Sequence, residues 1–300
     1  MNDASITLAL LRSKAVIGLT GVFNSSGGLQ SIGIQCSLCH STVDNSVGPG
    51  IGRRLDGWAN RDLNVGAIVA LSPALDTATR NVFNSWGPGK YDPRFNFDGQ
   101  NGPQVIPPAY GLAGIHSITA TGDGADIEYW NRYVAVTQMG GHGSFSEPRT
   151  GVNVTNGTDD LVSSKLPGLQ AYQLSLAAPT PPANSFDPAP AARGQALFAG
   201  IAGCAGCHSG PEFTDANTTL HPASDSMGEP EAPGVPSYAS RSATKQYRTA
   251  PLKGVWQHAP YFHNGSAATL EDVVSTYNTR RSLGLTAPQM ADLVQYLKSL

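Results

Sequence analysis

Apolar residues recur at three- and four-residue intervals in two segments near the end of the chain. The first segment opens at Thr269, and its apolar face consists of Leu270, Val273, Val274 and Tyr277. The second opens at Thr286, and its apolar face consists of Met290, Leu293, Val294, Leu297 and Leu300. This spacing is that of an amphipathic helix, and Asp272 and Gln289 stand three residues after the opening threonines, as in a capping box. The pattern predicts two helices here.

Three weaker helical patterns lie upstream, at residues 126–137, 158–176 and 191–201. In the second of them, Pro167 is expected to kink or split the helix. The segment Ala177–Ala192 is rich in proline and is typical of a semi-rigid linker. A division at this linker predicts two domains, residues 1–180 and 181–300, in a mainly α protein.

A faint internal repeat supports two copies of one module. Pro108–Gly111 recurs as Pro251–Gly254, at an offset of 143 residues. At the same offset Glu128 matches Glu271, and each glutamate stands at the start of a predicted helix. Each half therefore carries a turn followed by a helix in the same order.

Composition and charge narrow the class of protein. The 34 glycines and 22 prolines exceed the usual share, which favours short helices joined by long ordered loops. The net charge of −3 argues against a nucleic-acid partner. The apolar stretch Ile6–Phe23 carries Arg12 and Lys14 and lacks the features of a signal peptide, and no apolar run is long enough to span a membrane.

All four cysteines lie in two copies of one five-residue pattern. The first motif, Cys36–His40, reads CSLCH, and the second motif, Cys204–His208, reads CAGCH. C-x-x-C-H is the attachment signature of c-type haem, in which both thiols bond to the porphyrin and the histidine becomes the proximal iron ligand. A zinc site would need closer C-x-x-C pairs, and a redox dithiol needs no histidine. The motifs predict two covalent haems, held by Cys36, Cys39, His40, Cys204, Cys207 and His208.

Covalent haem attachment also bears on the compartment. In most bacterial lineages haem is joined to thiols outside the cytoplasm. We therefore expect a periplasmic protein whose export signal has been removed from this chain.

The segment Thr249–Val274 carries a resemblance to a known family. It reads TAPLKGVWQHAPYFHNGSAATLEDVV and resembles the signature of the bacterial di-haem cytochrome c peroxidase and MauG superfamily. The similarity is strong over residues 190–300 and weaker over residues 30–150, and rubber-oxygenase relatives share the same signature. The resemblance implies two cytochrome c-like haem domains with long Gly/Pro-rich loops, related by a pseudo-twofold axis. It also implies one six-coordinate haem for electron transfer and another that reacts with peroxide or dioxygen, with a small redox protein or quinoprotein as electron partner.

The resemblance suggests a sixth ligand for the His208 haem. Tyr277 resembles the position that holds a distal methionine in the peroxidases and a tyrosine in the MauG-like branch, although a buried core tyrosine would also explain it. Met227 and His258 are alternative distal ligands. The family pattern favours a hydrogen-bonding role for His263 over a ligand role.

For the His40 haem, the corresponding candidate is Met139, which follows the predicted helix 126–137. His142 and His116 compete with it, and Met139 could instead fill a gap beside the ring. A His/Met haem would suit electron transfer.

Catalytic residues are less clear, and the sequence gives no evident acid–base group. The weak candidates are Glu128, Glu271, His116 and His263. Three functions follow. One is a peroxidase-type, MauG-like oxidoreductase, another is a non-catalytic electron carrier with both haems six-coordinate, and the third is an oxygenase of the rubber-oxygenase type.

An Asn/Asp-rich run and two tryptophans each have a functional and a structural interpretation. The run Asn96–Asn101 offers alternating oxygen ligands and suggests a Ca²⁺ site, although an Asn/Asp-rich turn is the simpler interpretation. Trp58 and Trp86 are candidates for carrying electrons between haems, with core packing as the alternative.

Overall fold

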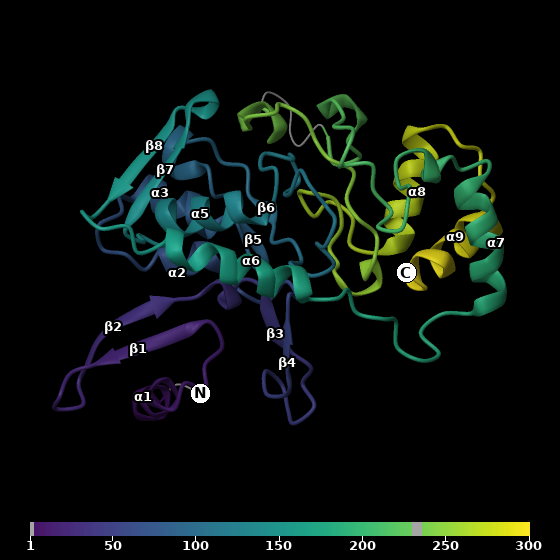
Figure 1. Ribbon diagram of the computed structural model, residues 1–300. Coiled ribbons are helices and arrows are strands. Elements are labelled where there is room, and N and C mark those ends of the chain that lie inside the picture. The colour runs from purple at the N-terminus through teal and green to yellow at the C-terminus, as the bar shows by residue number, and fades with distance from the viewer. Residues whose placement is uncertain (1–2, 230–235) are drawn as a thin grey trace. The chain divides into compact units, whose positions relative to one another are not determined.

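The computed structural model describes residues 3–229 and 236–300, and Figure 1 shows its helices and strands. The described chain is mostly helical with small two-stranded sheets, which confirms the mainly helical prediction at that level. It divides into two compact units. The first unit comprises residues up to Tyr91 and Ile106–Tyr110, and the second comprises Asp92–Val105 and Gly111–Leu300. The predicted haem domains, residues 1–180 and 181–300, stay a prediction.

The first unit consists of short elements joined by loops. Its elements are α1 (Ala4–Arg12), β1 (Leu19–Phe23), β2 (Leu29–Ile34), η1 (Cys36–Leu38), β3 (Ser41–Val43), β4 (Arg54–Asp56), α2 (Val65–Val69), α3 (Thr77–Asn84) and β5 (Lys90–Tyr91). β1 pairs with β2, and β3 pairs with β4, both antiparallel. Trp86 is buried and packs edge-on against Phe83 and Tyr91, at centroid distances of 4.8 and 5.7 Å, so this tryptophan has a packing role.

The second unit holds most of the helices. Its elements are α4 (Phe95–Asp98), β6 (Gln104–Val105), α5 (Ile127–Thr137), β7 (Gly143–Glu147), η2 (Pro148–Thr150), β8 (Val152–Asn156), η3 (Ser163–Lys165), α6 (Leu166–Ser175), α7 (Pro188–Ala199), η4 (Cys204–Gly206), η5 (Ala223–Asp225), η6 (Ala239–Arg241), η7 (Val255–Gln257), α8 (Leu270–Arg280) and α9 (Ala287–Lys298). β7 pairs antiparallel with β8. None of the helices in the described residues has the length and apolar character needed to cross a bilayer.

Helices α7, α8 and α9 pack together next to the C-terminus (Figure 1). Both predicted capping boxes are present, at Thr269 for α8 and Thr286 for α9, so these two helix predictions are confirmed. α7 approaches α9 so closely that a Cβ added at Gly194 would lie 2.9 Å from Tyr296 Cβ. Glycine at this position therefore allows the two helix backbones to pack.

Two predicted boundaries are wrong for local reasons. The chain is not helical from Thr158, because the Asp160 side chain accepts the Val162 and Ser163 amides, each at 2.9 Å, and caps the short η3 turn. α6 then begins at Leu166, with Pro167 in its first turn, where proline is tolerated. The linker prediction runs too far, because Asp187 caps α7 and the helix begins at Pro188.

Candidate haem sites

The first C-x-x-C-H motif lies on a tight turn in the first unit. η1 places the His40 amide 3.1 Å from the Cys36 carbonyl oxygen, so both thiols and the imidazole belong to one compact turn. Asn60 secures this turn, because its amide and its side chain donate to the Cys39 and Leu38 carbonyls at 2.8 and 2.9 Å.

His40 is prepared as a neutral nitrogen ligand. Its Nδ1–H donates to the Pro107 carbonyl oxygen at 3.0 Å, which leaves Nε2 for a metal. Burial lowers the pKa of the imidazole, and the charge of Arg61 lowers it further. A neutral imidazole with one fixed nitrogen is the form that binds iron.

The second motif repeats this geometry in the second unit. η4 places the His208 amide 2.9 Å from the Cys204 carbonyl oxygen. The His208 Nδ1–H donates to the Phe213 carbonyl oxygen at 3.1 Å, and burial lowers the pKa of this ring as well. The two motifs, which share little sequence outside the pattern, thus present the same ligand in the same way.

None of the four cysteines forms a disulfide. Burial raises the pKa of all four, to about 11 for Cys39. Free paired thiols beside a neutral, oriented imidazole match the donor set of c-type haem, so the residues present fit this group at both motifs.

Tyr277 lies close to the second motif. Burial, with a smaller contribution from the nearby thiols of Cys204 and Cys207, raises the pKa of its phenol to about 12. Its ring also lies 6.2 Å from that of Phe262. The structure therefore brings the leading distal candidate into the electrostatic range of the attachment cysteines.

The other candidates near this motif have defined contacts. Met227 is buried, and its carbonyl oxygen accepts from Arg280 of α8 at 2.7 Å. His258 is half-buried, with its ring 5.8 Å from that of Tyr261. Their ligand roles stay predictions.

His263 belongs to a buried polar network that sequence reasoning found only in part. Its Nε2 lies 3.2 Å from the Tyr247 hydroxyl, and its Nδ1 lies 3.3 Å from the Ser226 hydroxyl. Tyr247 donates to Glu229 at 2.6 Å, and its ring stacks on His263 at 4.5 Å. Both ring nitrogens of His263 have hydrogen-bond partners, and its functional role stays a prediction. Glu229 was missed because it lies in an irregular loop without periodicity.

The candidates for the His40 haem belong to the second unit. Met139 is half-buried at the end of α5, where its amide donates to the Val134 carbonyl at 3.0 Å. His116 and His142 are exposed, and the His116 amide donates to Asn217 at 2.7 Å. Because His40 lies in the first unit, the pairing of any of these residues with it stays a prediction.

The two helix-start glutamates differ in setting. Glu271 is exposed and forms an ion pair with Lys298 at 3.0 Å. Glu128 is half-buried in the first turn of α5, and its amide is capped by Asp126 at 2.9 Å. No contact of either side chain indicates acid–base chemistry, and both stay untested candidates.

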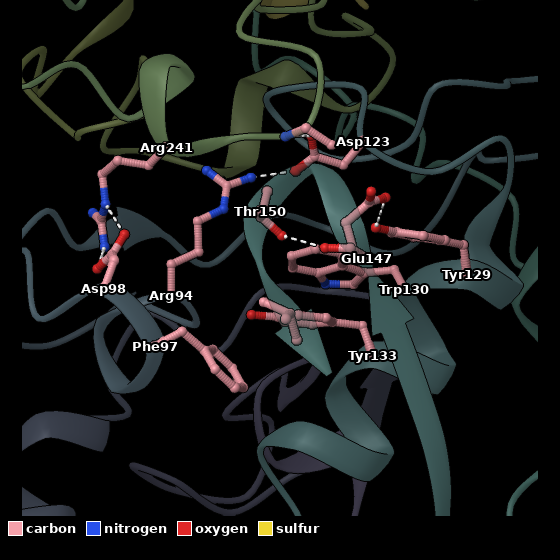
Figure 2. Close-up of a pocket in the computed structure, with 12 residues that line it drawn as sticks. Arg94, Phe97, Asp98, Asp123, Tyr129, Trp130, Tyr133, Glu147, Thr150 and Arg241 are labelled. Carbon is pink, nitrogen blue, oxygen red and sulfur yellow. Dashed lines mark hydrogen bonds and ion pairs between the residues drawn. The ribbon is translucent and has the colours of Figure 1, made fainter. Parts of the chain in front are cut away.

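The run proposed for calcium is engaged elsewhere. Arg241 donates Nε to Asp98 Oδ2 at 2.8 Å and Nη2 to Asp98 Oδ1 at 2.9 Å. This pair lies beside a small cavity of about 40 Å³. Figure 2 shows the pair together with two other interactions of the cavity wall, the ion pair of Arg94 with Asp123 and the hydrogen bond from Tyr129 to Glu147. Because Asp98 is the only carboxylate of the run, the structure gives a calcium loop no support there.

Comparisons with known proteins agree with the motifs. The family model described as RoxA-like, cytochrome c-like matches residues 246–283. Cytochrome-c peroxidase IdrP1 of Denitromonas iodatirespirans is 32% identical over 151 residues, covering 37% of this chain and 40% of that protein. The methylamine utilization protein MauG of Methylorubrum extorquens is 33% identical over 124 residues, covering 37% of this chain and 35% of MauG. The chain thus spans well under two thirds of these relatives.

Two solved structures are similar over 66% of this chain and 73% of theirs. They are a Kuenenia stuttgartiensis hydrazine synthase, at a TM-score of 0.45 and 19% identity, and a MauG-like protein associated with microbial copper homeostasis, at 0.42 and 20%.

The motifs and the matched segments define a class, that of proteins related to c-type cytochromes. Within this class, parts of the chain are similar to cytochrome-c peroxidases and to MauG, and residues 246–283 match the RoxA-like, cytochrome c-like model.

Proposed function

We propose that this protein is a di-haem c-type cytochrome with peroxidase-type, MauG-like oxidoreductase activity. One observation carries the proposal. Each C-x-x-C-H motif holds a half-buried imidazole whose Nδ1 is fixed to a backbone carbonyl, at 3.0 Å for His40 and 3.1 Å for His208. Two equivalent sites in one chain support one-electron chemistry at two centres.

The haem would supply the redox chemistry, and the chain's residues hold and tune it. The paired thiols fix the porphyrin edge, and each histidine presents Nε2 in a fixed orientation. Burial favours the neutral phenol of Tyr277, so binding to iron as a phenolate would require the loss of its proton. A hydrogen-bonded chain from Glu229 through Tyr247 to His263 can move a proton within the second unit.

The chemistry of covalent haem attachment also bears on the cellular location and the redox partner. Covalent haem attachment supports a periplasmic location. The electron partner would be a small redox protein or a quinoprotein, as the relation to MauG suggests, and the negative net charge gives nucleic acid no role.

A non-catalytic electron carrier is the second candidate. It is favoured by the position of Tyr277 near the attachment thiols, since a phenolate ligand there would close one iron. The RoxA-like match over residues 246–283 supports the oxygenase as a third candidate.

Low-temperature EPR of the fully oxidised and half-reduced protein separates these functions. A high-spin ferric signal in either state indicates an open iron and supports a peroxidase or oxygenase. Consumption of peroxide with a reduced electron donor then identifies the peroxidase, and dioxygen uptake with an organic substrate identifies the oxygenase. Two low-spin ferric signals in the oxidised protein, with only a low-spin signal left in the half-reduced protein, would overturn the enzymatic proposal and leave the carrier. Tyr277→Phe is the matched variant, because a high-spin signal that appears only on this change identifies Tyr277 as a ligand.

A further inference from the structure

Arg248 stands apart from the other arginines of the described chain. Its Nη1 atom is fully enclosed, and its side chain has no hydrogen bond or ion pair in residues 3–229 and 236–300. Enclosed arginines elsewhere are paired: Arg94 bonds to Asp123, and Arg241 bonds to Asp92 and Asp98. The Arg248 side chain as a whole is half-buried, but its enclosed Nη1 has lost contact with water without gaining a hydrogen bond, which is costly and points to an anionic group beside this atom.

The backbone around Arg248 lies beside the second C-x-x-C-H motif. The Thr214 hydroxyl, shortly after His208, donates to the Thr249 carbonyl at 2.6 Å. A backbone hydrogen bond of Ala250 also raises the pKa of the His208 ring, as the hydrogen bond to the Phe213 carbonyl does. Arg248 is therefore part of the segment that lines the proximal histidine, and its own amide is fixed to the Ala120 carbonyl at 2.9 Å.

Burial makes the positive charge of the Arg248 guanidinium less favourable. Burial alone lowers the pKa of the guanidinium to about 10. Two acidic side chains of this loop region bond to other groups, since Asp215 Oδ2 lies 2.9 Å from His221 Nε2 and Glu229 accepts from Tyr247 at 2.6 Å, while Asp215 Oδ1 has no hydrogen-bond partner. Within residues 3–229 and 236–300, no carboxylate pairs with Arg248, which leaves its Nη1 available to an anion that is bound to the protein.

We propose that Arg248 binds a propionate carboxylate of the haem attached at the second motif. This inference rests on the proposed function, because it requires a haem at that motif. A porphyrin fixed by two thioethers carries two carboxylates, and a planar guanidinium binds a carboxylate through paired, charge-assisted hydrogen bonds. Arg248 would thereby neutralise one propionate and raise the potential of this haem.

The test compares Arg248→Gln and Arg248→Lys with the wild-type protein, all carrying covalent haem. Arg193→Gln is the matched control, because Arg193 lies in the same unit with its side chain 61% exposed and paired to Asp292. Haem per chain is measured by the pyridine haemochrome assay, and both potentials are measured by spectroelectrochemical titration.

The glutamine variant is expected to keep its haem load and to lower the potential of one haem only. The fall should correspond to about a tenfold change in its ratio of reduced to oxidised forms, about 59 mV. The lysine variant should recover most of the shift because it keeps the charge, and Arg193→Gln should change neither potential. If Arg248→Gln loses one haem while Arg248→Lys keeps two at wild-type potentials, the inference is also supported.

Two haems per chain with unchanged potentials in Arg248→Gln would refute the inference and leave the proposed function intact. Failure of both Arg248 variants to load haem, with normal loading of Arg193→Gln, would assign the residue to folding and would also overturn it. A free carboxylate is the alternative source of the anion. Potentials of the dialysed wild-type protein that shift on adding acetate would favour that source over the propionate.

Discussion

The contact between α7 and α9 supplies the sharpest stability prediction. A Cβ at Gly194 would lie 2.6 Å from the Asp292 carbonyl carbon and 2.9 Å from Tyr296 Cβ, where real contacts below 3.0 Å are essentially never seen. Backbone atoms cannot rotate away, so Gly194→Ala must push the two helices apart. Overpacking of this kind costs up to about 3 kcal/mol, and the better helix propensity of alanine returns about 1 kcal/mol. We therefore expect a net loss of about 2 kcal/mol.

Thermal unfolding followed by circular dichroism measures this loss. For a unit of this size, about 2 kcal/mol corresponds to a fall in Tm of about 4–8 °C. Gly168→Ala is the matched control, because Gly168 also lies in a helix, α6, but an added Cβ meets nothing within 4 Å. The control should be neutral or more stable by about 0.5–1 kcal/mol. Equal Tm values for Gly194→Ala and the wild type would refute the close approach of α7 and α9.

Three further changes have predictable effects. Thr269→Ala removes the α8 capping box and should cost about 1 kcal/mol in chemical unfolding, and an unchanged midpoint would show that the cap does not stabilise the helix. Arg241→Met leaves Asp92 and Asp98 without their partner, and because the Arg241 side chain is only 3% exposed, we expect a loss of about 3–5 kcal/mol in the same assay. A loss below about 1 kcal/mol would mean that these carboxylates are solvated. Hydrogen bonds from the Ser163 side chain and backbone lower the pKa of Asp160 from 3.8 to about 2, so its ionised form stabilises the fold above pH 3.8 and this contribution is lost as the pH falls through about 2. Asp160→Asn should therefore be less stable than the wild type at neutral pH and equally stable below about pH 2, and a difference that persists in acid would contradict this assignment.

Local signals explain what the sequence could predict. The C-x-x-C-H motifs, the capping boxes at Thr269 and Thr286 and the apolar faces of α8 and α9 depend on residues within a few positions of one another. Their geometry follows from bond lengths and helical periodicity alone. For that reason the helices appear where the pattern placed them.

The wrong predictions came from side chains that compete with the backbone pattern. The Asp160 side chain binds the Val162 and Ser163 amides, and α6 begins at Leu166, eight residues after the expected start, with Pro167 in its first turn instead of at a kink. Asp187 likewise converts the end of a proline-rich stretch into the first turns of α7. In each case the side chain of one residue set the boundary of the helix. The spacing of apolar residues does not reveal the effect of a single polar side chain.

Contacts between distant loops explain what the sequence could not predict. Glu229, Tyr247 and His263 come from three irregular segments, and no spacing rule joins them. Arg248 is ordinary in the sequence and becomes informative only because folding encloses its Nη1 atom without a hydrogen-bond partner. These features depend on tertiary packing, which composition and periodicity do not encode.

The number of haems bound covalently to each chain tests the central claim most directly. Intact-mass spectrometry of the denatured and washed protein measures it, since thioether-linked haem survives denaturation and free haem does not. The account predicts the mass of two haems on the wild-type chain and of one haem on the Cys36→Ala, Cys39→Ala double variant. A wild-type chain without added mass, or a double variant with the full wild-type load, would contradict the account.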